Sequence, residues 1–412
     1  MMLWSYRLLL APWQKTDYTK INKKNTLAVM VKKRTYKGNR NALVLTGGGA
    51  RAAYQVGVLT AITKFVPRNH GIPFPILSGT SAGAINATAL ACYASCFHLG
   101  VKKLEWMWKN LKTNKIYHSD PFRVFNHISK GIIGSFQADY ANKTARSLLN
   151  NAPLRDLLNM VVDFKRIDAN ILNGYLSSVA VTASSYTSGD SISFYQSEQS
   201  ISPWFRAKRH GEPSQINSEH LMASAAIPMV FPSIKIRNEH FGDGSVHQIS
   251  PLSPAIHMGG KRLFIIGVEQ PKEPLHAMEN NPHPPTTATI AGHLLDTIFT
   301  DTMQSDIERM QRINNTLSLI PKEDRQKRDD LQKIDSLLIN PSHDFNAIAL
   351  NYFSELPLSI RLLLRTVGIT SESESSIVSY LLFEQEYCKQ LIKLGFEDAM
   401  EKETQVREFL SL

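Results

Sequence analysis

The sequence has few cysteines, which excludes several protein classes at once. Its 412 residues include only Cys92, Cys96 and Cys388, too few for the disulfide framework of a small secreted protein. Cys92 and Cys96 also lack the further Cys or His partners at the spacing that a zinc site needs. We therefore expect reduced, largely buried thiols, and we expect neither a metal ion nor another cofactor.

Long apolar runs are also absent. No charged residue occurs between Arg68 and Lys102, but Pro73, Pro75 and several Ser, Thr and Gly residues interrupt this stretch. The pattern favours a buried strand and helix over a membrane span. The apolar segment near the N-terminus is short, is interrupted by Arg7, and has no small-residue cleavage site behind it. We expect a cytoplasmic protein with no signal peptide and no transmembrane span.

Positive charge is concentrated in residues 1–40. The formal net charge is +10, and this segment alone contributes +9, from ten Lys or Arg residues and one acid. Trp4, Tyr6 and Trp13 lie among these cations, which suits peripheral contact with an anionic membrane. A solvated terminal arm is the alternative, and translation from Met30 would remove most of the segment. The interleaved aromatic and basic residues of 104–131 fit helical packing, so we expect no nucleic acid partner.

Three consecutive glycines, Gly47 to Gly49, separate a short apolar run from a helical pattern. Residues 41–46 predict a buried strand, and the segment up to about residue 65 predicts a helix. Gly47, Gly49 and Ala52 also fit the fingerprint of a dinucleotide site, which requires an acidic residue about 20 positions later. No Asp or Glu occurs from residue 41 to residue 104. The dinucleotide hypothesis is therefore disfavoured, and a P-loop is excluded because its Gly-Lys-Ser/Thr ending is missing.

A second strand, turn and helix follow directly. Residues 74–79 predict a strand, and G-T-S-A-G at 79–83 opens a small-residue helix. Two such units in succession predict an α/β fold with a parallel sheet. A serine at so sharp a turn has a strained backbone, and Gly79 and Gly83 would let the strand and helix approach closely. Ser81 is therefore a candidate nucleophile at the N-terminus of a helix, which favours negative charge.

A nucleophilic serine needs a base and donors for the oxyanion. The backbone amides of Gly47, Gly48 and Gly49 lie on the neighbouring turn and are candidates for an oxyanion hole, where one donor is typically worth about 3 kcal/mol. Arg51 would support this loop or bind an anionic head group, and a surface salt bridge is the alternative. Asp243 lies between two glycines after the alternating segment 231–241.

Four motifs occur in the order found in the patatin-like phospholipase family, and the chain resembles a bacterial-type member of it. These motifs are G-G-G-x-R at 47–51, G-x-S-x-G at 79–83, ASAAIPMVFP at 223–232 and Asp-Gly at 243–244. The resemblance covers residues 43 to about 269. It implies a three-layer α/β/α sandwich with a mostly parallel central sheet, and hydrolysis of phospholipids or other acyl-ester lipids without a metal.

The resemblance also implies residue roles. Ser81 would be the nucleophile and Asp243 the general base of a Ser-Asp dyad that acts through an acyl-enzyme, with Gly244 among the supporting glycines. Ala52 and Ser245 depart from the family, which commonly has glycine at the first position and glycine or alanine at the second. Because an ordinary carboxylate is a weak base at neutral pH, we expect burial to raise the pKa of Asp243.

Two alternatives stay open. The order Ser, Asp, His along the chain also allows a triad that uses His247 or His257. The protein can also be a catalytically silent lipid-binding module that keeps the fold.

Composition divides the chain into three parts. Residues 1–40 are the basic N-terminal arm, and residues 41–270 are the predicted patatin-like α/β hydrolase domain. Residues 271–412 start with a Pro-rich connection and continue with helical patterns. We therefore expect a C-terminal helical region after the α/β domain.

Overall fold

The computed structural model describes part of the chain. The described residues are 40–124, 126, 147–197, 201–269, 290, 292, 294, 296–297, 301–321, 332–366, 368–369 and 376–412. The N-terminal arm, apart from Arg40, lies outside them, and so does its predicted membrane contact. The Pro-rich connection also lies outside the described residues.

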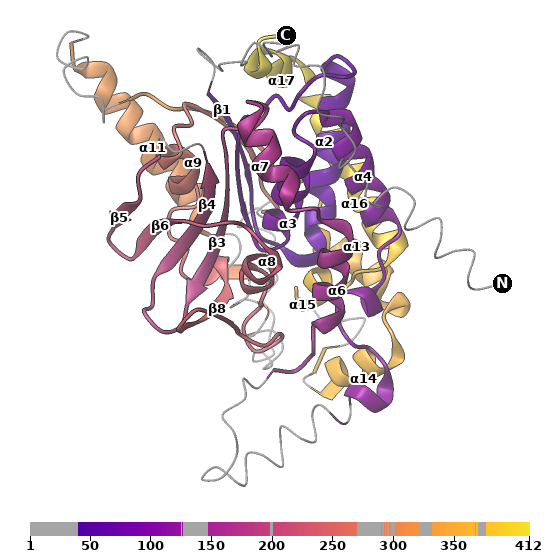
Figure 1. Cartoon of the computed structure of the whole chain (residues 1–412). Helices are drawn as coiled ribbons and strands as arrows, with labels where there is room; N and C mark the ends of the chain where they lie inside the picture. Colours follow the sequence, from indigo (N-terminus) through magenta and orange to yellow (C-terminus); the bar gives the residue numbers. More distant parts are fainter. Residues whose placement is uncertain are drawn as a thin grey trace, which may run out of the picture.

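In the described part of the chain, ten strands form one mixed sheet (Figure 1). Its parallel part has the order β10-β9-β1-β2-β3. These strands are β1 (Asn41–Leu45), β2 (Ile76–Thr80), β3 (Ser178–Ser185), β9 (Arg262–Ile266) and β10 (Asp335–Ile339). Beyond β3 the sheet continues through β4 (Ser191–Ser197), β6 (Arg209–Pro213) and β5 (Trp204–Arg206). The end of β3 also pairs antiparallel with β8 (Glu239–Asp243), which pairs in turn with β7 (Ile234–Ile236).

Strand β1 shows that the sheet is covered on both faces. All five of its residues are buried, as in strands that have helices on either side. Leu43 and Leu45 belong to one hydrophobic cluster, and Ala42 and Val44 belong to a second. Because side chains alternate along a strand, these two clusters lie on opposite faces of the sheet.

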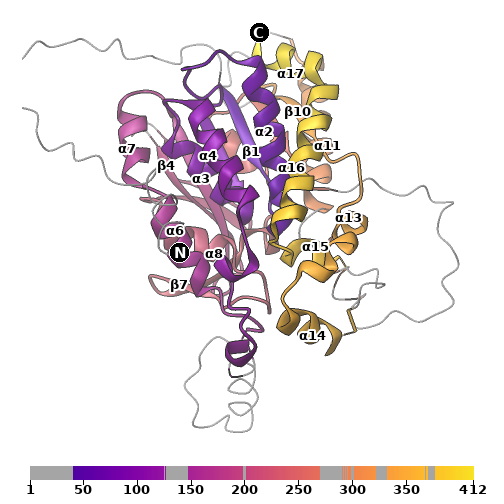
Figure 2. The same ribbon diagram turned by 90° about the vertical axis from the view of Figure 1, so that its right-hand side faces the viewer.

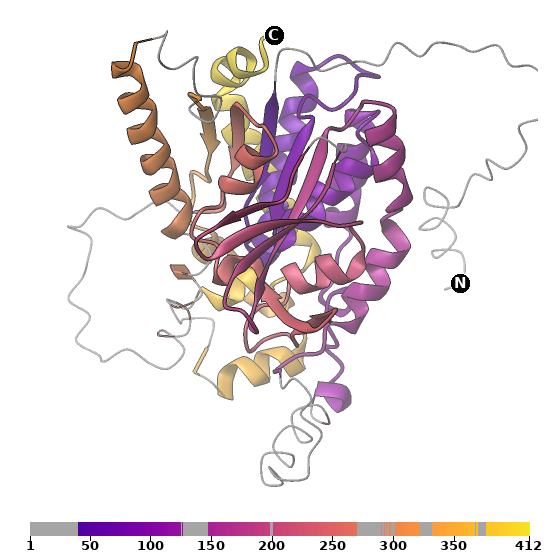
Figure 3. The same ribbon diagram turned by 60° about the vertical axis from the view of Figure 1, so that its left-hand side comes forward.

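Helices complete the two outer layers (Figure 3). The first layer includes α2 (Ala53–Phe65), α3 (Ala82–Cys92) and α4 (Phe97–Lys109), and the second includes α9 (Ser253–His257) and α11 (Asp301–Leu319). Shorter helices link the strands: η1 (Gly49–Ala52), η2 (Thr113–Lys115), α6 (Ala152–Val161), α7 (Lys165–Leu172), α8 (Ser218–Ser224) and η3 (Gly244–Val246). The predicted three-layer α/β/α sandwich with a mostly parallel sheet is confirmed.

The C-terminal part of the chain packs on the same core. It contains α13 (Phe345–Asn351), η5 (Phe353–Glu355), α14 (Leu358–Thr366), α15 (Ile377–Leu381), α16 (Gln385–Glu401) and α17 (Glu403–Leu410). Figure 2 shows α16 beside α2, and a Cβ at Gly57 would collide with the carbonyl of Ile392. The predicted helical region is confirmed, but the sequence did not predict β10, which extends the sheet next to β9. The boundary at residue 270 stays a prediction.

Among the described helices, none combines the length and apolar composition that crossing a bilayer requires.

Candidate active site

Ser81 occupies the sharp turn between β2 and α3. Its φ of 54° and ψ of −130° lie in a region that side chains rarely adopt. A Cβ at Gly79 would lie 2.5 Å from the carbonyl oxygen of Gly83, and a Cβ at Gly83 would lie 2.5 Å from that of Thr46. The glycines on either side of Ser81 are therefore required by close backbone packing, as their spacing predicts.

Ser224, the last residue of α8, holds the backbone of this turn. The Ser81 N–H donates a hydrogen bond of 2.8 Å to Ser224 Oγ, and the Ser224 hydroxyl donates one of 2.6 Å to the carbonyl of Thr182. Two residues later, the carbonyl of Ala226 accepts a hydrogen bond of 2.9 Å from the N–H of Asp243. One short segment therefore fixes the positions of both Ser81 and Asp243.

Asp243 is completely buried at the end of β8, opposite Ala183 of β3. Its Oδ1 accepts a hydrogen bond of 3.0 Å from the Ser245 N–H. Its Oδ2 has no hydrogen-bond partner within the described structure. Burial raises the pKa of Asp243 from 3.8 to about 6, and the hydroxyl of Ser81 is near enough to oppose part of this rise. A Cβ at Gly244, next to Asp243, would lie 2.8 Å from the side chain of Thr80, next to Ser81, so the fold brings these two parts of the chain together.

The glycine loop lies beside this pair because β1 and β2 are parallel neighbours, with Leu45 opposite Gly79. Gly49 has a φ of +54°, and a Cβ on it would collide with the carbonyl of Tyr380. Gly48 lies against Val268, whose Cγ2 would be 2.8 Å from an added Cβ. Both positions therefore leave little room for a side chain, and Gly49 lines the same cavity as Ser81.

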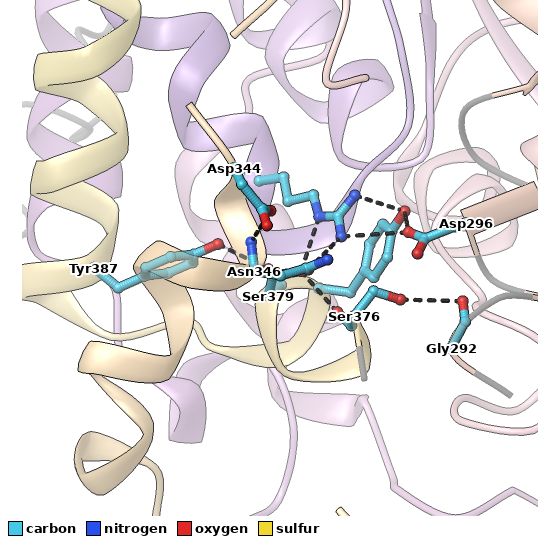
Figure 4. A network of polar contacts seen from close by, with 9 residues as sticks. Gly292, Asp296, Asp344, Asn346, Ser376, Ser379 and Tyr387 are labelled. Carbon is cyan, nitrogen blue, oxygen red and sulfur yellow. Dashed lines mark hydrogen bonds and ion pairs between the residues drawn. The ribbon is translucent and has the colours of Figure 1, made fainter. Parts of the chain in front are cut away.

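Arg51 follows this loop and is fully buried. Its guanidinium donates hydrogen bonds of 2.9 Å each to Ser379 Oγ, to the Tyr380 hydroxyl and to Asn346 Oδ1, and it lies 3.8 Å from the centroid of the Tyr380 ring. The carboxylate oxygen Oδ1 of Asp296 lies 3.4 Å from Nη2 of Arg51 and forms an ion pair with it (Figure 4). The alternative of a surface salt bridge is therefore wrong. Arg51 instead joins the glycine loop to the C-terminal helices.

An apolar pocket opens next to Ser81. Its wall comes from α3, α4, α6, the segment after α8 and the C-terminal part of the chain. Its lining residues are Gly49, Ser81, Ala82, Ile85, Met107, Trp108, Leu111, Ile116, Leu154, Leu157, Leu158, Ala225, Ile227, Phe231 and Phe383. About 40 Å³ of it admits a water-sized molecule, so a long apolar ligand would require these side chains to move apart. The contribution of Phe383 was not predicted from the sequence.

The two candidate histidines differ in their surroundings. His257 stacks on Trp204 at 5.0 Å between ring centroids, in the helical layer opposite α3. Burial and the neighbouring Arg206 and Arg209 lower the pKa of His257 to about 4. His247 donates its backbone N–H to Ser184 Oγ at 3.0 Å. Neither histidine is among the described residues that line the pocket at Ser81, and the structure does not bring His257 to the serine.

In the part of the chain that the structure describes, no group of three or more His, Cys, Asp or Glu side chains is placed to hold a metal ion. The three cysteines are free. Cys92 and Cys388 are buried, and Cys96 is half-buried.

Comparison with known proteins gives one family. The model described as "Patatin-like phospholipase" matches residues 43–256, which is more than half of the 412 residues. Patatin-like phospholipase domain-containing protein 7 of Rattus norvegicus is 41% identical over 69 residues, and that of Mus musculus is 39% identical over 69 residues. The matched segment is 17% of this chain and only 5% of each of these relatives.

Two solved structures are similar at low identity. VipD from Legionella pneumophila has a TM-score of 0.33 and 13% identity, covering 90% of this chain and 67% of that chain. Human GIVD cytosolic phospholipase A2, in complex with methyl gamma-linolenyl fluorophosphonate inhibitor and terbium chloride, has a TM-score of 0.40 and 10% identity. That match covers 90% of this chain and 59% of the other.

Proposed function

The chain belongs to the patatin-like phospholipase family, and from this premise we propose that it hydrolyses lipid acyl esters with Ser81 as nucleophile and Asp243 as general base. The observation that carries the proposal is the pairing of a strained serine with a buried carboxylate. Asp243 Oδ2 has no hydrogen-bond partner within the described structure, and the pKa of this group is raised to about 6. Such a carboxylate is a far better base near neutral pH than an exposed one.

The reaction has two halves. Asp243 accepts the proton of the Ser81 hydroxyl as Oγ attacks the ester carbonyl, and it returns this proton to the alcohol that leaves. Ser81 then carries the acyl group. In the second half Asp243 deprotonates a water molecule that attacks this ester, and the fatty acid departs as the proton passes to Ser81.

The negative charge on the carbonyl oxygen needs donors in both halves. We assign this role to the backbone amides of Gly47, Gly48 and Gly49, where one donor is worth about 3 kcal/mol of transition-state stabilisation. The N–H of Ser81 already donates to Ser224, so it is not free for this task. Arg51 acts as a positioning residue, since its side chain binds the C-terminal helices and is buried away from solvent.

The apolar pocket suits the hydrocarbon chain of the substrate, and a phospholipid is the substrate class that the family favours. The chain spans 5% of the length of the curated relatives it matches, so their activities do not define its head-group preference. A cytoplasmic location, and membrane contact through residues 1–40, belong to the same proposal.

A fluorophosphonate probe tests the proposal, because it labels activated serines. We expect the wild-type protein to be labelled and to release fatty acid from phospholipid vesicles, and we expect Ser81→Ala to lose both. Ser193→Ala is the matched control, since Ser193 is also buried but lies on β4. A wild-type protein that neither labels nor releases fatty acid is the silent lipid-binding module.

The triad alternative needs a separate variant. His247→Ala combined with His257→Ala should keep most of the activity if the dyad operates. A loss as large as that in Asp243→Asn would instead assign the reaction to a triad.

A further inference from the structure

Five large apolar side chains are exposed at one end of the molecule. Phe122 is 77% exposed, Leu148 41%, Met229 80%, Leu358 67% and Leu362 60%. We call these five residues the apolar rim. Single exposed apolar residues are common on protein surfaces, but a contiguous group of them marks an interaction site.

Contacts between the segments show that the rim is contiguous. The N–H of Leu148 donates a hydrogen bond of 2.9 Å to the carbonyl of Met229. The Ser359 hydroxyl of α14 donates to the carbonyl of Ser119, three residues before Phe122. The N–H of His118 donates a hydrogen bond of 2.9 Å to the carbonyl of Asn150, which joins these two pairs of segments. Helix α14 and the segments around residues 122, 148 and 229 therefore lie next to one another, at the lower end of the molecule in Figure 1.

The same segments also line the pocket at Ser81. Ile227 and Phe231 line the pocket, and Met229 lies between them at the tip of the turn with a φ of 65°. Ile116 lines the pocket six residues before Phe122, and Leu154 lines it six residues after Leu148. The chain segments that carry the rim therefore also contribute part of the wall of the pocket at Ser81.

Charge on the rim fits an anionic surface. Helix α14 has no acidic residue and carries the exposed Arg365 three residues after Leu362, while Arg361, three residues after Leu358, is half-buried. Arg123 is exposed beside Phe122. The nearby Asp120 accepts the backbone N–H groups of Phe122 and Arg123, so part of its capacity as an acceptor is used within the chain. Leucines and arginines in this arrangement are typical of a helix that lies in the interface of a bilayer.

We propose that the apolar rim is the surface by which this protein lies on an anionic phospholipid bilayer, with the pocket at Ser81 facing the lipid. The inference rests on the proposed function for its substrate, but the binding itself needs no catalysis. An acyl chain would then pass from the bilayer into the pocket without crossing water, which removes the cost of exposing its hydrocarbon.

Sedimentation of the full chain with large vesicles tests the rim. The vesicles contain phosphatidylcholine with or without phosphatidylserine, and the salt concentration is low or 0.5 M, where charge contacts of residues 1–40 are screened. Leu358→Asp with Leu362→Asp should weaken binding by about tenfold or more at both salt concentrations. Leu172→Asp with Leu319→Asp is the control, because these leucines are even more exposed, at 79% and 85%, but lie on α7 and at the end of α11. The control should bind like the wild type.

Two further measurements keep the outcomes distinct. Hydrolysis of a short soluble ester should be unchanged in the rim variant, which shows that it folds, and Ser81→Ala should bind vesicles like the wild type. If vesicle binding depends on the rim but no ester is hydrolysed, the proposed function is wrong and the inference about the rim stands. Unchanged vesicle binding by the rim variant overturns the inference, and so does an equal loss in the control. A rim variant that only dissociates a dimer assigns the surface to a second copy, which also overturns it.

Discussion

The backbone N–H of Ser81 donates a 2.8 Å hydrogen bond to the hydroxyl of Ser224, 143 residues further along the chain. This bond holds the one residue of the turn whose φ is positive, and Ser224 in turn is held by Thr182. The geometry of the nucleophile thus depends on a side chain that does not itself react.

Ser224→Ala should lower kcat by about tenfold to a hundredfold and leave KM nearly unchanged, because displacement of a reacting group by about 1 Å carries such a cost. Loss of the two hydrogen bonds should reduce the free energy of unfolding by about 1–3 kcal/mol. Steady-state kinetics and urea unfolding measure the two effects. Ser193→Ala removes a comparable buried bond to Thr182 Oγ1 and should lose stability without the loss in kcat. Equal kcat values in the two variants would contradict the positioning role.

The pH dependence of the reaction follows from the burial of Asp243. Only the deprotonated carboxylate can accept the proton of Ser81, and the pKa of this group is raised to about 6. We expect kcat/KM on a soluble ester to rise about tenfold per pH unit below 6 and to level off above it. A rate that stays constant between pH 4 and pH 8 would show that another group is the base.

Asp243→Asn should stabilise the protein at neutral pH. The folded state raises the pKa of Asp243 from 3.8 to about 6, so the folded state binds this proton more tightly than the unfolded state. Stability falls as the pH rises from about 4 to 6 and stays lower above that range. The neutral amide of the variant avoids this loss in the free energy of unfolding, which amounts to roughly 3 kcal/mol. Urea unfolding should show the gain in stability of Asp243→Asn at pH 8 and none at pH 3.5. An equal gain at both pH values would contradict the raised pKa of Asp243.

Arg51→Lys should impair both stability and activity. A lysine keeps the positive charge but cannot reach Ser379, Tyr380 and Asn346 together, so buried acceptors lose their donors. We expect a loss of about 3 kcal/mol or more in the free energy of unfolding and a lower kcat through the glycine loop. Arg166→Lys is the control, because its guanidinium stacks on the Tyr93 ring at 4.3 Å and lies nearer the surface. A variant of Arg51 as stable as this control would contradict the structural role.

The sequence predicts those parts of the site that depend on local constraints. Gly79 and Gly83 are needed by a turn only five residues long, so their spacing identifies the position of Ser81 without any knowledge of the fold. The resemblance to the patatin-like phospholipase family is confirmed, and so is the layered α/β architecture. The roles of Ser81, Asp243 and the glycine loop stay predictions.

The sequence did not predict contacts between residues that are far apart along the chain. Arg51 and Tyr380 are 329 residues apart and Ser81 and Ser224 are 143 apart, and no local pattern marks such pairs. Ser224 lies within a motif that the sequence singled out, but its hydroxyl has no distinguishing neighbours in the chain. Strand β10 was missed because five residues of mixed exposure carry a weak signal, and its pairing with β9 provides most of its stability.

The network around Arg51 also has a consequence for the order of events during synthesis. Its partner Ser379 follows it by 328 residues, which at typical rates of translation takes roughly 15 to 65 s. For most of that interval a growing chain contains Ser81 but not the C-terminal side chains that bind Arg51 beside the glycine loop. We expect ribosome-bound chains that stop before residue 376 to resist fluorophosphonate labelling. The long separation between Arg51 and its partners along the chain would then delay the reactivity of Ser81 until nearly all of the chain has been made.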